Sequence, residues 1–316
     1  MADLIKTLSG NLWKFVYAWL LPAIVAVSAF ILLIFPAIDD LSLVRQLTKG
    51  ANQNLIVRSI IFVVTALIVA VLLALNSTPL YRLLEGYTWP RWASGARKRA
   101  QVRRWERLKD LAFASPESGV DLIQQQLAWE RLKEYPDEQY ILPTRLGNAI
   151  KAFETYGVSR YGLDSQTLWY ELVTVAPDAL QKEEQDARAV VDFFVSAIYL
   201  AAVFSAVAVL IGILRADLQS LVAGAITAML TPFFYSRAVK SVRQWRFVVQ
   251  ALVNVGRLKL ASALGLVLPS TLEEERLMWR ALTGFVFWGS EKYAKDLERF
   301  RISTAATAQG TEDQPK

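Results

Sequence analysis

The chain has 316 residues, of which 54% are hydrophobic and 20% charged, and its 35 basic and 29 acidic side chains give a formal net charge of +6. It contains no cysteine and no histidine. These absences exclude disulfides, thiolate or imidazole metal ligands and a cysteine nucleophile. The positive excess is small and scattered, so we expect no nucleic-acid partner and take membrane phosphate as the anionic neighbour.

Four long segments without a charged residue dominate the sequence. The hydrocarbon core of a bilayer is about 30 Å thick, and a helix crosses it with roughly 20 apolar residues. Only a helix satisfies its own backbone N–H and C=O groups in lipid. The sequence therefore predicts an all-α integral membrane protein with four transmembrane helices, at residues 15–38, 59–81, 193–214 and 218–236. The first segment is too long for a signal-peptide core, so we interpret it as a retained anchor.

Basic residues near the span ends predict the orientation, because they resist translocation. Clusters of Lys and Arg follow the second and fourth spans, whereas the loops 39–58 and 215–217 hold few uncompensated charges. We expect both termini in the cytoplasm. The predicted organisation is a cytosolic N-terminus at 1–14, a first hairpin at 15–81, a helical cytosolic domain at 82–189, a second hairpin at 190–236, a cytosolic stalk and C-terminal helix at 237–302, and a disordered tail at 303–316.

Helical periodicity continues through the polar parts of the chain. A final helix is expected to begin at Ser270 or Thr271, where Glu273 and Glu274 complete capping boxes, and to run toward Phe300. The fourth span is expected to continue as a stalk to about Val267. In the central block the pattern predicts helices at 96–113, 120–132 and 144–155, a turn at 156–162, and a short helix at 165–173 capped by Asp164.

A basic cluster follows the second span. Next to a bilayer, such residues are attracted to anionic lipid, although the same cluster also serves as a topology signal. Both interpretations stay open. The candidate lipid contacts are Arg97, Lys98, Arg99, Arg103 and Arg104.

Small and weakly polar residues recur on one side of the fourth span at steps of four, three and four. Such a strip favours close helix packing with interhelical hydrogen bonds. Alternatively, the strip lines a water-filled pathway formed by several subunits. Its residues are Ser220, Gly224, Thr227 and Thr231. Pro232 lies just beyond and is a candidate gating hinge, because its missing N–H frees the carbonyl of Ala228.

The sequence carries no recognisable catalytic arrangement. Neither GxxxxGK[ST] nor GxGxxG occurs, and histidine or cysteine motifs are impossible. We therefore expect no enzyme, no cofactor and no metal site. The predicted spans also lack an ionisable residue at depth, and Asp192 lies at a rim, which disfavours a proton-coupled transporter.

The strings Pro143-Thr144-Arg145-Leu146-Gly147-Asn148 and Tyr161-Gly162-Leu163-Asp164-Ser165 resemble a pattern of uncharacterised bacterial membrane proteins with this four-helix layout. The resemblance covers roughly residues 70–215. It implies a location in the bacterial inner (plasma) membrane and no assigned function.

Two functional hypotheses remain. The first is a homo-oligomeric, channel-like membrane protein whose cytosolic helices sense a ligand or partner. The second is a non-conducting adaptor, in which the cytosolic helices dock a protein partner and the spans serve as an anchor.

Overall fold

The computed structural model describes residues 12–41, 55–115 and 121–301. The predicted segment 1–14 lies largely outside these residues, and the predicted tail 303–316 lies wholly outside them. Most of the described residues are helical, and the described ranges contain one isolated antiparallel bridge, between Leu266 and Arg301. The chain divides into two compact units. Unit 1 comprises Met1–Ser94, Thr144–Leu146 and Asp186–Val242, and unit 2 comprises Gly95–Pro143, Gly147–Gln185 and Arg243–Lys316.

Each unit is built from helices that come from separate stretches of the chain. Unit 1 holds η1 (Val16–Leu20), α2 (Leu21–Leu33), η2 (Phe35–Ala37), α4 (Leu55–Leu75) and α5 (Ser77–Glu85), together with most of α11 (Asp178–Arg215) and the first part of α12 (Leu218–Ala263). Unit 2 holds most of α6 (Arg91–Ala112), α7 (Leu122–Leu132), η4 (Glu138–Tyr140), most of α8 (Arg145–Glu154), α9 (Tyr156–Tyr161), α10 (Trp169–Val175), α13 (Leu272–Trp288) and α14 (Glu291–Glu298), with the remaining parts of α11 and α12.

Among the residues that the structure describes, four helical segments are long and apolar enough to cross a membrane. They are Leu12–Ala37, Leu55–Leu75, Asp178–Arg215 and Leu218–Ala263. Only 11% to 33% of the most apolar window in each is buried within the molecule. So much exposed apolar surface on long helices is characteristic of lipid-facing segments, and the prediction of an all-helical protein with four such segments is confirmed.

The predicted second span, 59–81, is wrong at its carboxyl end. α4 ends at Leu75, and α5 begins at Ser77 with Pro79 in its first turn. Asn76 separates the two helices, and its side-chain Nδ2 donates to the carbonyl of Leu72 over 2.8 Å. Proline suits the first turn of a helix but cannot donate to an existing one, so the chain starts a new helix here.

The first span contains a local change of helix type. Val16–Leu20 is π-helical, and it precedes Pro22 in the first turn of α2. Because Pro22 has no N–H, the carbonyl of Ala18 cannot make the usual bond to the residue four positions later. The buried hydroxyl of Ser196, on α11, lies 2.8 Å from this carbonyl and 2.8 Å from the carbonyl of Phe193 in its own helix, so its one proton is shared between them. A polar bond thus joins two apolar helices of unit 1.

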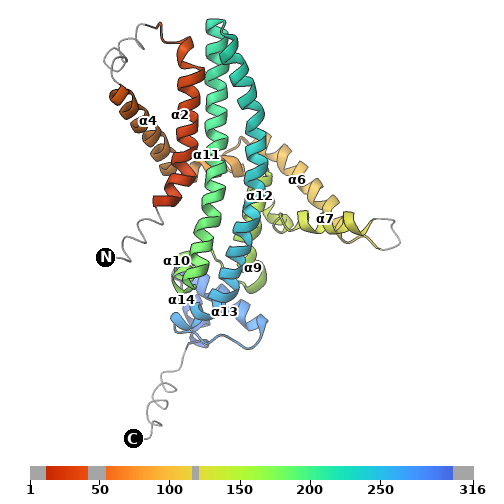
Figure 1. Ribbon diagram of the computed structural model, residues 1–316. Coiled ribbons are helices and arrows are strands. Elements are labelled where there is room, and N and C mark those ends of the chain that lie inside the picture. The colour runs from red at the N-terminus through yellow and green to blue at the C-terminus, as the bar shows by residue number, and fades with distance from the viewer. Residues whose placement is uncertain (1–11, 42–54, 116–120, 302–316) are drawn as a thin grey trace. The chain divides into compact units, whose positions relative to one another are not determined.

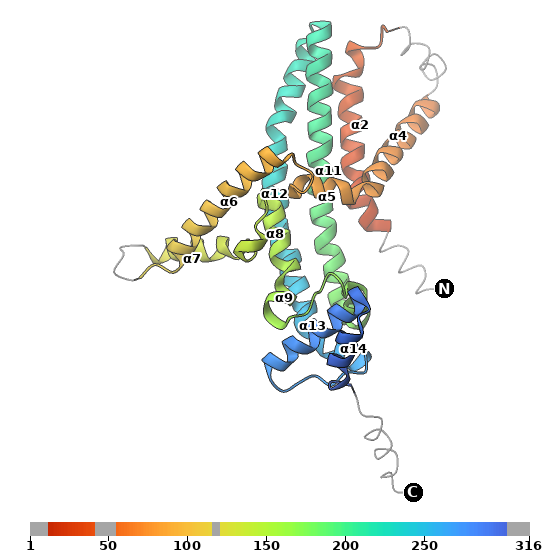
Figure 2. The same cartoon turned by 180° about the vertical axis from the view of Figure 1, so that it is seen from behind.

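Within unit 1, α11 and α12 lie side by side in both ribbon views (Figures 1 and 2). Asp217 caps α12, since its Oδ2 accepts the N–H of Ser220 over 2.8 Å. Buried contacts between the helices of this unit involve many small residues. They include Ala18, Ala23, Ala70 and Ala189 in one cluster, and Ala208 and Ala223 with Ile34 and Phe204 in another.

Unit 2 has a core of large side chains from α10, α12, α13 and α14. Its fully buried members include Leu168, Leu172, Leu260, Met278 and Trp279. A buried polar network borders this core: Arg257 Nη1 lies 2.5 Å from Glu275 Oε1, which also accepts from Trp279 Nε1 over 3.0 Å. Arg257 and Glu275 thus neutralise each other's charge, while Nε of Arg257 is buried without a hydrogen-bond partner among the described residues.

The helices predicted for the central block at 96–113, 120–132 and 144–155 correspond to α6, α7 and α8. The turn predicted at 156–162 is wrong, because Tyr156–Tyr161 forms the helix α9 and only Gly162 adopts a left-handed conformation, at φ 75°. The last helix is also not continuous. Thr271 caps α13 as predicted, but Gly289 ends this helix and α14 follows.

Candidate functional site

The predicted strip on α12 divides into a buried and a half-buried part. Ser220 is fully buried and Gly224 is buried, whereas Thr227 and Thr231 are half-buried. The hydroxyl of Thr227 donates to the carbonyl of Ala223 over 2.7 Å, and that of Thr231 donates to the carbonyl of Thr227 over 3.2 Å. Both threonine hydroxyls are therefore satisfied by their own helix.

Gly224 marks a close approach between α11 and α12. A Cβ atom at this position would lie 2.7 Å from Val209 Cγ2 and 3.0 Å from the Val209 backbone nitrogen. The carbonyl of Gly224 accepts the hydroxyl of Ser205 over 2.9 Å. The structure thus engages Gly224 in contact with α11, in the arrangement that small residues allow between membrane helices.

Pro232 lies inside α12, which the structure describes as one helix from Leu218 to Ala263. The helix shows no interruption at this residue, so the proposed hinge stays a prediction.

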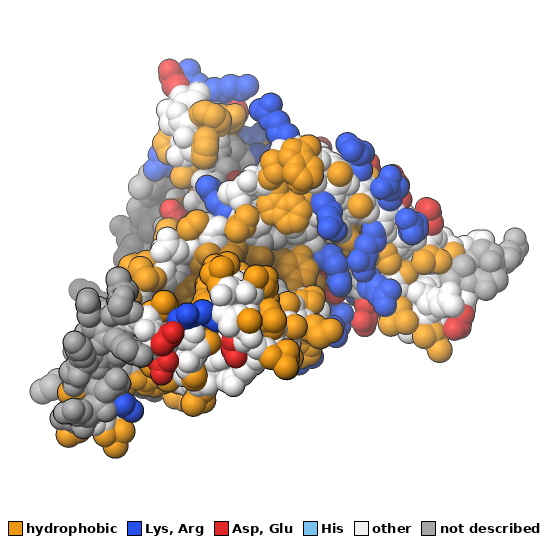
Figure 3. Space-filling view, turned by 90° about the horizontal axis from the view of Figure 1, so that it is seen from above, with side chains coloured by type: hydrophobic (Ala, Val, Ile, Leu, Met, Phe, Trp, Pro, Cys, Tyr) orange, Lys and Arg blue, Asp and Glu red, His pale blue; other side chains and the backbone are white. Residues whose placement is uncertain are grey.

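The predicted lipid contacts lie on α6. Arg97, Lys98, Arg99 and Arg103 are exposed, and Arg104 is half-buried. α6 packs on α7 through Leu108 and Ala112, which contact Ala128. Figure 3 shows Lys and Arg side chains gathered over the part of the molecule that contains α6. The helix therefore presents a basic surface, and what this surface binds stays a prediction.

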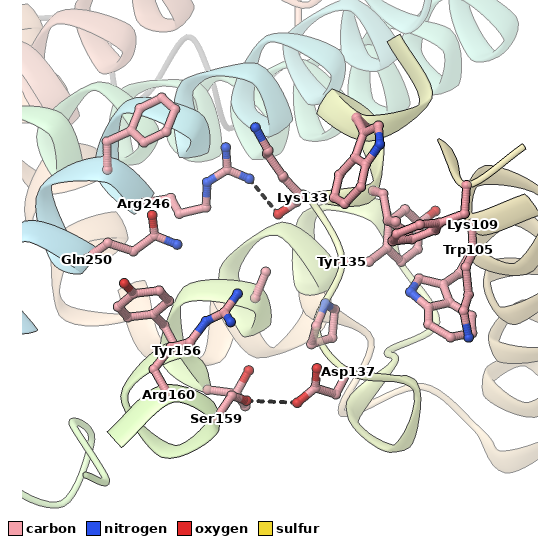
Figure 4. Close-up of a pocket in the computed structure, with 17 residues that line it drawn as sticks. Trp105, Lys109, Lys133, Tyr135, Asp137, Tyr156, Ser159, Arg160, Arg246 and Gln250 are labelled. Atoms are coloured by element: carbon pink, nitrogen blue, oxygen red, sulfur yellow. Dashed lines mark hydrogen bonds between the residues drawn. The ribbon is translucent and has the colours of Figure 1, made fainter. Parts of the chain in front are cut away.

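A cavity of about 670 Å³ lies within unit 2. No sequence pattern predicted it. Figure 4 shows side chains from several helices around it. α6 supplies Trp105, Lys109 and Phe113; the α7 region and the segment after it supply Trp129, Leu132, Lys133, Tyr135, Pro136 and Asp137; α8, α9 and the residue between them supply Ala152, Thr155, Tyr156, Ser159 and Arg160; and α12 supplies Arg246, Phe247 and Gln250.

Arg246 is the most deeply buried charged group on this wall, with 4% of its surface exposed. Its Nη1 donates to the carbonyl of Lys133 over 2.5 Å. Its Nε is buried and has no hydrogen-bond partner among the described residues. A buried donor without a partner costs about 1–3 kcal/mol, and more when it is charged.

Other polar groups on the wall are fixed by hydrogen bonds. Asp137 accepts from the hydroxyl of Ser159 over 2.8 Å, and Tyr156 donates to Asn254 Oδ1 over 3.1 Å. The ring of Phe113 packs on that of Trp129, with ring centres 4.7 Å apart. The cavity therefore combines cationic groups, aromatic rings and a held carboxylate.

The sequence carries no direct signal of this cavity. Val242, Trp245, Val249 and Leu252 form an apolar stripe on α12, and Arg246 follows directly after Trp245. A basic residue beside such a stripe is usually exposed, so neither the burial of Arg246 nor the segments that meet it can be predicted from the sequence.

The motif at 143–148 has a structural role. Asn148 is fully buried, and its side chain bonds both the N–H and the carbonyl of Leu142, over 2.6 Å and 3.0 Å. These bonds close the loop before α8.

Comparison with known proteins gave no match to a protein family, to a curated protein or to a solved structure.

Proposed function

We propose that the chain is a channel-like, homo-oligomeric membrane protein in which unit 2 senses a ligand. One observation carries this proposal: α12 is a continuous helix that bears the small-residue strip in unit 1 and part of the cavity wall in unit 2. A ligand that shifts Arg246, Phe247 or Gln250 would therefore act on the helix that carries the strip.

The spans offer surface for both lipid and other subunits. Large apolar side chains are exposed on α4 and on the first part of α12, among them Ile60, Val63, Val222, Ile226 and Met229. A surface of this kind requires a covering. In the proposed assembly, lipid covers part of it and further copies of the chain cover the rest.

The proposal confines the conducting pathway to the half-buried part of the strip. Ser220 is fully buried and Gly224 is taken up by the contact with α11, so Thr227 and Thr231 remain as the candidate pore-lining residues. Both present a hydroxyl on a stretch of α12 that is otherwise apolar, which suits a narrow wetted constriction.

For the membrane, we propose two helical hairpins in a bacterial inner membrane, with both termini and unit 2 in the cytoplasm. The basic residues after the second and fourth spans support this orientation.

Flux through liposomes that contain the purified protein tests the proposal. We expect ion flux in the wild type and its loss when Thr227 and Thr231 are both changed to leucine. Ala225→Leu, at an exposed position of the same helix, is the matched control and retains flux. Absence of flux under every ligand condition, or wild-type flux in the double variant, contradicts a pore at this strip.

A second candidate, a non-conducting adaptor, is favoured by the carboxyl end of α13. Phe285, Val286, Phe287 and Trp288 are consecutive and all exposed. Such a patch suits a protein contact. Affinity purification from native membranes distinguishes the two functions: an adaptor brings down a stoichiometric partner that Phe287→Ser with Trp288→Ser removes, whereas the channel brings down only copies of itself.

A further inference from the structure

The cavity of unit 2 has a positive wall. Lys109, Lys133, Arg160 and Arg246 line it, against Asp137 as the carboxylate on its described wall. Asp137 is engaged by Ser159, and the cations come from different segments of the chain. Cations that converge on one space from separate elements raise the local potential for an anion.

Arg246 specifies the kind of anion. Within the described ranges it forms no ion pair, and nearby Glu134 lies 3.7 Å from a nitrogen of Arg243 instead. The carboxylate of Glu134 therefore acts on both Arg243 and Arg246 and makes no direct pair with the buried guanidinium, and an anion in the cavity would supply that direct pair. The planar fork of arginine matches the oxygen spacing of phosphate, which it binds through two parallel hydrogen bonds.

The rest of the wall is suited to a planar ring. Trp105, Trp129, Tyr135 and Tyr156 contribute aromatic surface. In Figure 4, the side chains of Tyr156, Arg160, Gln250 and Arg246 surround one part of the space, and those of Trp105 and Lys109 lie across from them. Stacking on aromatic faces accepts any flat heterocycle. The volume of about 670 Å³ also lies in the range of small-molecule pockets.

We propose that this cavity binds a soluble small molecule that carries both a phosphate and a planar ring, the combination found in nucleotides. The proposal rests on the proposed function and names the class of ligand that unit 2 senses. A lipid headgroup offers the phosphate but no ring for the aromatic part of the wall. A soluble ligand with a phosphate and a ring therefore fits both the cationic part and the aromatic part of the cavity wall.

Binding to the full-length protein in detergent tests the proposal, with ATP, adenosine and inorganic phosphate as probes. Titration calorimetry gives the Kd, and quenching of tryptophan fluorescence reports on Trp105 and Trp129. We expect ATP to bind at least tenfold more tightly than either adenosine or inorganic phosphate, because only ATP occupies both halves. A Trp105→Ala variant is expected to weaken ATP binding and to leave phosphate binding unchanged.

The charge variants use exposed residues, so that folding is preserved. Lys133→Gln and Arg160→Gln each remove a cation from the wall, and we expect each to raise the Kd for ATP by about five- to tenfold. Arg131→Gln and Lys259→Gln are the matched controls, because both residues are exposed and lie off the wall, and they should keep the wild-type Kd.

Lipid is tested separately. ATP titrations are repeated in nanodiscs of phosphatidylcholine and of phosphatidylglycerol. Equal ATP affinity in both supports a soluble ligand. Loss of ATP binding in phosphatidylglycerol alone assigns the cavity to a lipid phosphate and overturns the proposal.

The proposal is also overturned if no probe binds below millimolar concentration, if adenosine binds as tightly as ATP, or if the variants at 133 and 160 match their controls. Binding is measured without flux. If the protein binds ATP saturably but conducts no ions, the nucleotide-site proposal is retained and the channel function is rejected. If the protein conducts ions but does not bind ATP, the channel function is retained and the nucleotide-site proposal is rejected.

Discussion

The two units of the molecule pack their helices by different means. In unit 1 many of the buried contacts are made by alanine, glycine and serine, as at Gly224, Ser196 and Ala70. In unit 2 the core is built from leucine, methionine and tryptophan. Lipid is as apolar as leucine, so helices in it associate through close backbone approach and hydrogen bonds, whereas in water the burial of large apolar side chains drives packing. The residue sizes are thus consistent with a bilayer around unit 1 and water around unit 2.

The largest effect is expected in the core of unit 2. Trp279 is fully buried, and its Nε1 donates to Glu275. Trp279→Ala leaves a large cavity and removes one of the two bonds to Glu275 Oε1, so we expect a loss of about 3–5 kcal/mol in the free energy of unfolding. Trp288→Ala removes the same ring from a position that is 70% exposed and should change stability little. Denaturant titrations that give equal losses for the two variants would contradict this core.

The next effect concerns the close approach in unit 1. Gly224→Leu places side-chain atoms against Val209, including its backbone nitrogen, which cannot move without shifting α11. We expect a destabilisation of about 1–3 kcal/mol, measured by thermal unfolding in detergent. Ala225→Leu on the exposed side of the same helix should unfold like the wild type. If both variants unfold alike, α11 and α12 do not meet at Gly224.

A smaller effect is expected at the bond between α11 and the first span. Ser196→Ala removes the donor to the carbonyl of Ala18, and we expect a loss of about 1 kcal/mol. Ser236→Ala, whose hydroxyl bonds only within its own helix, at Phe233, is the control. The difference between the two variants in thermal unfolding isolates the bond between helices.

The smallest effect concerns the cap of α12. Hydrogen bonds from Ser220 hold the pKa of Asp217 below its usual range. Because the pKa of Asp217 is lower in the folded protein than in the unfolded chain, the cap contributes its full stabilisation above the usual carboxyl pKa. This stabilisation is lost as the pH falls through the pKa of Asp217 in the folded protein. We therefore expect a small loss of thermal stability in Asp217→Ala at neutral pH, and no difference from the wild type in strong acid, below about pH 3. A difference that persists in strong acid would exclude the carboxylate as its source.

The sequence predicted the four apolar segments and most helices of unit 2, because both depend on local properties: the length of an uncharged run and the spacing of apolar residues. It failed at Asn76, where an uncharged residue ends a helix and the uncharged run continues beyond it to Tyr81. It also mistook α9 for a turn. Gly157 suggests a loop, but glycine is used there because a Cβ atom would lie 2.5 Å from the carbonyl oxygen of Leu163.

The strip and the cavity show the same limit. Spacing along one helix placed Ser220 and Gly224 on a shared face, but the helix that Gly224 contacts became clear only from Val209 and Ser205. The cavity joins residues from Trp105 to Gln250, and no local pattern connects them. Sites made by one helix are accessible to sequence reasoning, whereas sites made by several segments require the fold.

The membrane arrangement is the claim on which the proposed function depends, and cysteine accessibility in intact bacterial cells tests it most directly. The chain has no native cysteine, so single substitutions are sufficient. We predict that Ala216→Cys, between α11 and α12, reacts with a membrane-impermeant maleimide in intact cells, and that Gln124→Cys, in unit 2, reacts only after permeabilisation. Labelling of Gln124→Cys in intact cells, or protection of Ala216→Cys, would contradict the account.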